Sequence, residues 1–157
     1  MYLETLYGHQ FGVTGMDCHR KERPISVGRD RTARAWKLQE DTHLIFRGGA
    51  RLSSADCLTV IKDDWFLTGH ETGQLCLWMT EKKKAVTTIE RAHGTATTTA
   101  ATTTTTIEEE TNTDVVGNGI GSVCSLKGSD LVCTGSNDGY LRFWKVRLLL
   151  FVSRVME

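Results

Sequence analysis

The sequence predicts an all-β fold that is assembled from three copies of one four-stranded antiparallel unit. The first observation is a repeat, because "SVGRDRTARAW", "TGHETGQLCLW" and "TGSNDGYLRFW" share their spacing and end at Trp36, Trp78 and Trp144. The first two tryptophans lie 42 residues apart (78 − 36), a period typical of repeat architectures. The second observation is that short apolar segments are bounded by turn residues, as β-strands are. The third is that no long apolar period of about 3.6 residues indicates a helix.

Each unit divides into four short segments that read as strands between turns. In the first unit, a Gly-Arg-Asp turn at 28–30 separates the second strand from the third. The predicted strands span residues 13–18, 24–27, 33–37 and 43–46; then 55–61, 65–68, 75–79 and 86–89; then 122–126, 131–134, 140–145 and 148–152. The corresponding units are residues 7–46, 47–90 and 91–152, with an outer strand of a preceding unit at 1–6 and a tail at 153–157.

An insertion lengthens the third unit. His9 stands 17 residues before Ser26, whereas His93 stands 41 residues before Thr134, so 24 extra residues follow the second histidine (41 − 17). The stretch "GTATTTAATTTTTIEEETNT" is almost entirely Thr, Ala and Glu, and such a composition buries too little apolar surface to offset its ordering entropy. We expect a disordered loop over about 94–119. A Thr-rich strand is the competing interpretation, but the alternating apolar partners of a strand are missing.

Composition limits what can be inferred about partners, although it does not exclude a local basic patch. Lys and Arg number 19 and Asp and Glu also number 19, so net charge gives no argument for nucleic acid or a membrane surface as the partner. The five cysteines contain no C-x-x-C pair, which predicts reduced thiols in an intracellular protein and no metal site or cofactor. The longest apolar run, "LLLFV", is far too short to span a bilayer.

The repeat carries the WD-repeat signature of β-propeller blades. Its elements are a period of about 42 residues, four strands per unit, and a Gly-His pair ahead of a phrase that ends in Trp. The tryptophans are followed by Lys37, Met79 and Lys145 rather than by Asp, so the dipeptide that names the repeat is degenerate here.

In such a blade the recurring polar residues meet in the interior. Ser26 lies ten residues before Trp36, which places it on the neighbouring antiparallel strand, and Asp30 lies in the turn between the two. His9 then donates to Asp30 and accepts from Ser26, while Ser26 accepts the indole N–H of Trp36. We predict this tetrad in the first unit and a second one in the third unit, formed by His93, Thr134, Asp138 and Trp144.

The second unit lacks two members of the set. Gly49 stands in place of the histidine and Thr72 in place of the aspartate, so only Thr68 and Trp78 remain. We expect this blade to depend on apolar packing, and we expect His70 to lie on the surface rather than to bind a metal. The packing residues are Leu58, Val60, Phe66, Leu75 and Leu77.

The first tetrad also contains the residue types of a hydrolase triad, in Ser26, His9 and Asp30. A triad needs an exposed nucleophile and an oxyanion hole, whereas the blade buries all three residues and accounts for Trp36 as well. The sequence therefore predicts a protein that is not an enzyme.

Several phrases resemble one family of WD-repeat proteins, the WD-repeat components of the U3 box C/D small nucleolar ribonucleoprotein. The phrases are "ETLYGHQ", "GRDRTARAWK", "WFLTGHETGQLCLW", "ERAHG", "SVCSL" and "DLVCTGSNDGYLRFW", and they lie within residues 2–94 and 122–144. The resemblance implies a seven-bladed propeller of which about three blades are present, as an open fragment. After Trp144 the sequence departs from the family pattern.

The resemblance also implies a function and a place in the cell. The expected role is a non-catalytic scaffold in pre-rRNA processing and small-subunit ribosome biogenesis, in the nucleus and nucleolus. The expected partners are U3 small nucleolar RNA and the box C/D core proteins. The alternative is a generic WD40 adaptor that recruits proteins in signalling or ubiquitin transfer, because one propeller scaffold hosts many roles.

Four basic residues are candidates for RNA contact. Arg29, Arg31, Arg34 and Lys37 cluster on one turn and the strand after it, where cationic side chains could neutralise phosphates. The competing interpretation is an ordinary solvated charged surface. We expect the isolated three-blade chain to self-associate, because its end blades leave strand edges and apolar faces uncovered.

Overall fold

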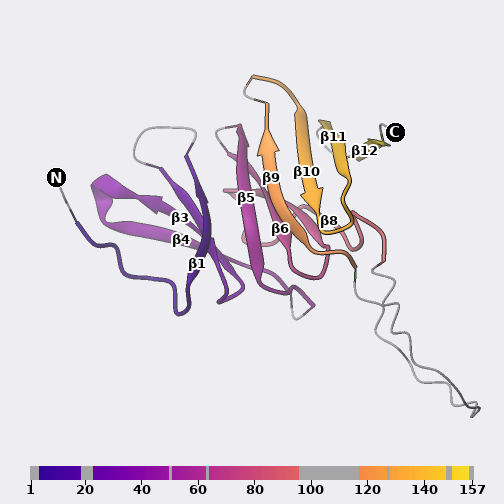
Figure 1. Cartoon of the computed structure of the whole chain (residues 1–157). Helices are drawn as coiled ribbons and strands as arrows, with labels where there is room; N and C mark the ends of the chain where they lie inside the picture. The colour runs from indigo at the N-terminus through magenta and orange to yellow at the C-terminus, as the bar shows by residue number, and fades with distance from the viewer. Residues whose placement is uncertain are drawn as a thin grey trace, which may run out of the picture.

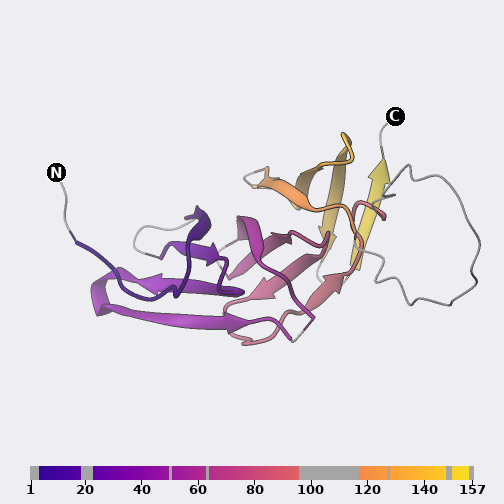
Figure 2. The same ribbon diagram turned by 60° about the horizontal axis from the view of Figure 1, so that its bottom comes forward.

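The fold is all-β and consists of three four-stranded antiparallel sheets, as the sequence predicts. The computed structural model describes residues 4–18, 23–49, 51–62, 64–95, 117–126, 128–147 and 150–155. Within each sheet the strands lie side by side in chain order, with the orders β1-β2-β3-β4, β5-β6-β7-β8 and β9-β10-β11-β12. Figures 1 and 2 show that the three sheets themselves also follow one another in chain order.

The first sheet comprises β1 (Val13–Asp17), β2 (Ile25–Gly28), β3 (Thr32–Lys37) and β4 (Thr42–Arg47), with a short 3-10 turn at Leu38–Glu40. The second comprises β5 (Ala55–Lys62), β6 (Trp65–His70), β7 (Leu75–Met79) and β8 (Thr87–Ile89). The third comprises β9 (Ile120–Ser125), β10 (Leu131–Ser136), β11 (Leu141–Arg147) and β12 (Leu150–Val155).

Two predicted boundaries are wrong at the ends of the chain. Residues 4–6 form no strand, and residues 1–3 lie outside the described residues, so no outer strand is present in the described part of 1–6. The last strand does not stop at residue 152. It continues to Val155, which pairs with Arg142 of β11, because the ladder between the two strands remains in register. The predicted loop lies largely outside the described residues, at 96–116.

The first strand of each sheet lies next to the first strand of the following sheet. β5 contacts both β1 and β9, and Figure 1 shows it between them. Polar side chains join these strands: the Val60 N–H donates to Asp17 Oδ2 at 2.8 Å, and the Ser125 hydroxyl donates to the Val60 carbonyl at 2.8 Å. The sheets are therefore linked by hydrogen bonds as well as by apolar packing.

Two apolar cores lie between neighbouring sheets, one between the first and second and one between the second and third. Neighbouring residues of β6 serve both, because Phe66 packs toward the first sheet and Leu67 toward the third. Successive strand residues point to opposite faces, so a sheet buried on both faces needs a continuous apolar run rather than an alternating one. The aromatic centre of the first core joins Phe46, Phe66 and Trp78, with Phe66 and Trp78 stacked at 6.0 Å between ring centroids.

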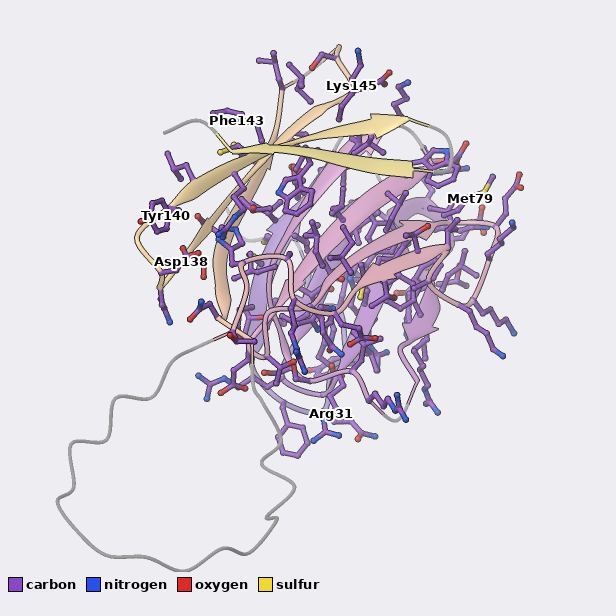
Figure 3. All side chains as sticks on the ribbon, turned by 90° about the vertical axis from the view of Figure 1, so that its right-hand side faces the viewer. Arg31, Met79, Asp138, Tyr140, Phe143 and Lys145 are labelled. Atoms are coloured by element: carbon purple, nitrogen blue, oxygen red, sulfur yellow. The ribbon has the colours of Figure 1, made fainter. Side chains whose placement is uncertain are left out.

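No described residue covers the outward face of the third sheet in this way. Leu131, Leu141 and Phe143 are between 40% and 59% exposed. Figure 3 labels Phe143 on this sheet. The self-association expected of the isolated chain stays a prediction.

Candidate functional site

The structure brings the four polar residues of the first sheet together. His9 Nδ1 lies 2.9 Å from Asp30 Oδ2, and His9 Nε2 lies 2.7 Å from Ser26 Oγ. The Trp36 indole N–H donates to the same Ser26 oxygen at 2.8 Å. Because a carboxylate only accepts, Nδ1 carries the imidazole proton and Ser26 donates to Nε2. Each of the side-chain N–H and O–H donors of these four residues therefore has an acceptor within the set.

The turn around Asp30 is held by the same carboxylate. Asp30 accepts from the Thr32 hydroxyl at 2.8 Å and from the Gln10 backbone N–H at 3.2 Å. Burial raises the pKa of Asp30, but the hydrogen bonds from Thr32, His9 and Gln10 outweigh it and hold the pKa below its ordinary value. The carboxylate thus ties the β2–β3 turn to the segment that precedes β1.

Gly8 precedes the histidine, and a glycine is needed there because the backbone lies very close to the side chains of Trp36 and Arg34. A Cβ atom at this position would lie 2.6 Å from Trp36 Cη2 and 2.8 Å from an Arg34 guanidinium nitrogen. The backbone therefore passes directly over the indole edge and the guanidinium, where a side chain does not fit.

Arg34 does not lie on an RNA-accessible surface, which corrects the expectation for this residue. Its exposed fraction is 6%, its guanidinium contacts His43 Nε2 at 2.6 Å, and it lies 3.9 Å from Asp30 Oδ2. Position 34 points to the same face of β3 as Trp36, since residues two apart on a strand share a face. The guanidinium therefore lies buried beside the tetrad, in contact with His43 and close to Asp30.

The third sheet repeats the arrangement. His93 Nδ1 lies 3.0 Å from Asp138 Oδ2, its Nε2 lies 2.7 Å from Thr134 Oγ1, and the Trp144 indole N–H donates to Thr134 at 2.8 Å. His93 and Thr134 are almost fully buried. Figure 3 shows Asp138 on the turn that leads to Tyr140.

The described ends of the predicted insertion are held together. Thr95 and Gly117 form an antiparallel bridge, and the Asn118 side-chain amide donates to the His93 carbonyl at 2.9 Å. The additional residues are thereby accommodated without displacing His93 from its tetrad.

The second sheet contains a substitute that the sequence analysis missed. His70 is 3% exposed, so the expectation that it lies on the surface is wrong. Its Nε2 lies 2.9 Å from Thr68 Oγ1, its Nδ1 lies 3.0 Å from the Ser53 carbonyl, and the Trp78 indole N–H donates to Thr68 at 2.9 Å. A histidine from within β6 thus occupies the role of the missing loop histidine.

The sequence contains a signal that His70 can replace the missing loop histidine. His70 lies two residues after Thr68, and strand residues at this spacing point to the same face. At the turn, Thr72 takes the place of an aspartate, and its hydroxyl lies 2.8 Å from Ser53 Oγ. The segment before β5 therefore supplies the acceptors that a carboxylate supplies in the other two sheets.

We expect Asp30→Ala to lower the free energy of unfolding by about 1–3 kcal/mol, because it leaves His9 and the turn N–H groups without their buried acceptor. Urea denaturation followed by tryptophan fluorescence measures the change. The exposed Glu81 makes a matched control, and Glu81→Ala is expected to change stability by about 0.5 kcal/mol or less. Equal effects of the two substitutions would contradict this role of Asp30.

A charged cleft lies between the first and second sheets. Its volume is about 620 Å³, and its lining residues are Arg29, Arg31, Ser53, Ser54, Asp56 and Glu71. Glu71 is held in place by the Ser54 hydroxyl, which donates to it at 3.0 Å. Burial raises the pKa of Asp56, the Glu71 carboxylate raises it further, and Arg29 acts in the opposite direction. The cleft therefore presents both signs of charge.

The four predicted basic residues do not form one surface. Arg29 and Arg31 line the charged cleft at the β2–β3 turn, whereas Arg34 is buried. Lys37 lies at the opposite end of β3, where it forms an ion pair with Glu40 at 2.8 Å. Only Arg29 and Arg31 therefore remain together as a cationic pair.

Two further observations concern metals and membranes. Within the described residues, no group of three or more His, Cys, Asp or Glu side chains is placed to hold a metal ion. No described helix has the length and apolar character needed to cross a membrane.

Comparison with known proteins identifies the repeat. The family model of the WD domain, G-beta repeat, matches residues 1–37 and 111–145. A solved structure, the crystal structure of RRP9 WD40 repeats, is similar with a TM-score of 0.82 and 29% identity, over 98% of this chain and 43% of that chain. These sheets are WD40 repeats.

The similar sequences confirm the resemblance to U3 ribonucleoprotein proteins. The WD40 chain is 33% identical to the U3 snoRNP-associated protein-like EMB2271 of Arabidopsis thaliana over 92% of its own length. It is 32% identical to the U3 small nucleolar RNA-interacting protein 2 of Mus musculus over 68% of its own length. The chain spans only 28% and 19%, respectively, of these two curated relatives.

Proposed function

We propose that these WD40 repeats belong to a non-catalytic scaffold of the U3 box C/D small nucleolar ribonucleoprotein. The scaffold acts in pre-rRNA processing and small-subunit ribosome biogenesis, in the nucleolus, by binding U3 RNA and the box C/D core proteins. The observation that carries the proposal is the similarity to U3 snoRNP-associated WD proteins over most of this chain. A seven-bladed ring, of which these are three blades, completes the proposed architecture.

The tetrad geometry supports a structural role for the Ser-His-Asp set rather than catalysis. Ser26 Oγ is engaged by both His9 and Trp36, and Ser26 is 5% exposed. An acyl-transfer nucleophile needs an open approach and donors for an oxyanion. The recurrence of the same hydrogen bonds around Thr134 supports the same conclusion, because a repeated blade needs them in each copy.

Within this proposal, RNA contact rests on Arg29 and Arg31. Both side chains line the charged cleft, and a guanidinium can donate to phosphate oxygens or stack on unpaired bases. Arg34 takes no part because it is buried, and Lys37 lies at the other end of its strand. This assignment is narrower than the four-residue cluster expected from the sequence.

The test is recovery of RNA with the affinity-tagged chain from cells. We expect U3 RNA to be enriched over a box H/ACA RNA, and we expect the double change Arg29→Ala and Arg31→Ala to reduce its recovery about tenfold or more. Lys82→Ala with Lys83→Ala is the matched control, since it removes two exposed positive charges elsewhere and should leave recovery unchanged.

The outcomes separate the two parts of the proposal. If U3 RNA is not enriched, the ribonucleoprotein scaffold is wrong. If it is enriched but the arginine variant recovers as much as the wild type, the scaffold stands and the arginine assignment is wrong.

One observation favours the second candidate, a WD40 adaptor that recruits proteins. Asp56 and Glu71 share the cleft with the two arginines, and carboxylates repel a phosphate backbone while they attract basic side chains. The change Asp56→Asn with Glu71→Gln separates the candidates. It strengthens RNA recovery if the cleft binds phosphates, and it weakens recovery of the co-purifying proteins if the cleft binds a protein segment.

A further inference from the structure

Two free thiols face each other across neighbouring strands of the third sheet. Cys124 on β9 and Cys133 on β10 are direct partners in the antiparallel register. Direct partners have Cα atoms about 4.5–5.5 Å apart, and their side chains share one face of the sheet. A disulfide bridges Cα separations of about 4.4–6.8 Å. The backbone therefore already holds these two residues within the span that a disulfide requires.

We propose that Cys124 and Cys133 form a redox-active dithiol that closes into a cross-strand disulfide. Both cysteines are free, Cys124 is exposed and Cys133 is half-buried.

The remaining three cysteines do not share these properties. Cys76 is buried, and burial raises the pKa of its thiol to about 11. Burial likewise raises the pKa of Cys57 to about 12, so neither thiol forms the reactive thiolate near neutral pH. Cys18 is exposed but lies beyond the end of β1, with no cysteine opposite it in the strand register.

The surroundings leave the pair open to solvent. On its other side Cys133 is paired with Phe143 of β11, which is 40% exposed, and Leu131 and Leu141 are more exposed still. A small oxidant can therefore approach Cys124 without any strand moving.

The reaction uses a small-molecule disulfide, such as oxidised glutathione, as the oxidant. The Cys124 thiolate attacks one oxidant sulfur, forming a mixed disulfide and releasing one thiol. The Cys133 thiolate then attacks the Cys124 sulfur, forming the Cys124–Cys133 bond and releasing the second thiol. The protein loses two protons and two electrons, and the oxidant is reduced to two thiols. Cys124 attacks first, because burial and the neighbouring Cys124 thiol raise the pKa of Cys133.

The test is treatment of the folded chain with oxidised glutathione, followed by alkylation, trypsin digestion and mass spectrometry. Lys127 separates the two cysteines, so they fall in different tryptic peptides, and the second peptide ends at Arg142. We expect a linked pair of these peptides, the loss of two free thiols from the intact protein, and full reversal by dithiothreitol.

Two variants make the result decisive. Cys133→Ser removes the resolving thiol, so it is expected to stop at a glutathione adduct on Cys124. Cys18→Ser removes an exposed thiol outside the pair and is expected to form the linked peptides as the wild type does. A persistent glutathione adduct on wild-type Cys124, or alkylation of both thiols without linkage, would overturn the proposal.

Discussion

Replacing Phe66 by Ala is expected to lower the free energy of unfolding by about 3–5 kcal/mol, the cost typical of a fully buried aromatic residue. The Phe66 side chain is fully buried, stacks on Trp78 and meets the edge of Phe46 at 5.2 Å between ring centroids. Its removal takes away both ring contacts and leaves a cavity in the close-packed core between the first two blades, which adds to the lost transfer free energy of the ring.

Urea denaturation followed by tryptophan fluorescence and by circular dichroism measures this loss. Phe11→Ala is the matched control, because Phe11 is 66% exposed and its removal should change stability by about 0.5 kcal/mol or less. If the two substitutions lower stability equally, the core between the first and second blades does not stabilise the chain as described.

Replacing His70 by Ala is expected to lower the free energy of unfolding by about 1–3 kcal/mol at neutral pH and to flatten its pH dependence. The substitution leaves the Ser53 carbonyl without its donor and the Thr68 hydroxyl without its acceptor. The expected loss is comparable to that of Asp30→Ala, since both residues complete the buried polar set of their blade.

The pH dependence follows from burial of a neutral imidazole. Desolvation lowers the pKa of His70 in the folded chain, while in the unfolded chain it is near 6.5. As the pH falls below about 6.5, the unfolded chain therefore takes up a proton that the folded chain does not. The contribution of His70 to the free energy of unfolding is fully present above that pH, and it is lost as the pH falls toward the pKa of His70 in the folded chain. Burial lowers the pKa of His93 as well, so a part of the slope remains in the variant.

Denaturation curves recorded between about pH 7 and pH 5 test this result. His70→Gln provides the comparison, because an amide keeps a donor and an acceptor but does not titrate. We expect Gln to restore part of the neutral-pH stability and none of the pH dependence. An unchanged slope in both variants would show that His70 does not contribute to the acid sensitivity.

The residues of the second blade show where sequence reasoning succeeded and where it failed. The apolar run around Phe66 and Leu67 predicts a strand correctly, because a sheet buried on both faces needs apolar residues at consecutive positions. In the same blade, the prediction that His70 lies on the surface is wrong. The expected histidine position holds Gly49, and the histidine that replaces it comes from within the strand, outside the repeat pattern.

The basic residues illustrate a second limit. Arg31 and Arg34 are three residues apart in the sequence, but one lines an open cleft and the other lies against the buried tetrad. Charge type and spacing are properties of the sequence, whereas exposure depends on which segment covers each strand face. Asp56 and Glu71 join the two arginines only because the first two blades pack side by side.

The amino-acid sequence alone determined the repeated unit, the order of its strands and the residues of two tetrads, because turn chemistry, strand alternation and residue spacing are local properties. Only the tertiary structure decided which charged groups meet in the cleft, that His70 completes the second blade, and that Cys124 faces Cys133. These pairings join residues far apart along the chain or depend on strand register, which the packing of whole strands sets. The local sequence pattern therefore specifies the strands and turns of each blade. The contacts between strands and between blades determine which polar, charged and thiol groups meet.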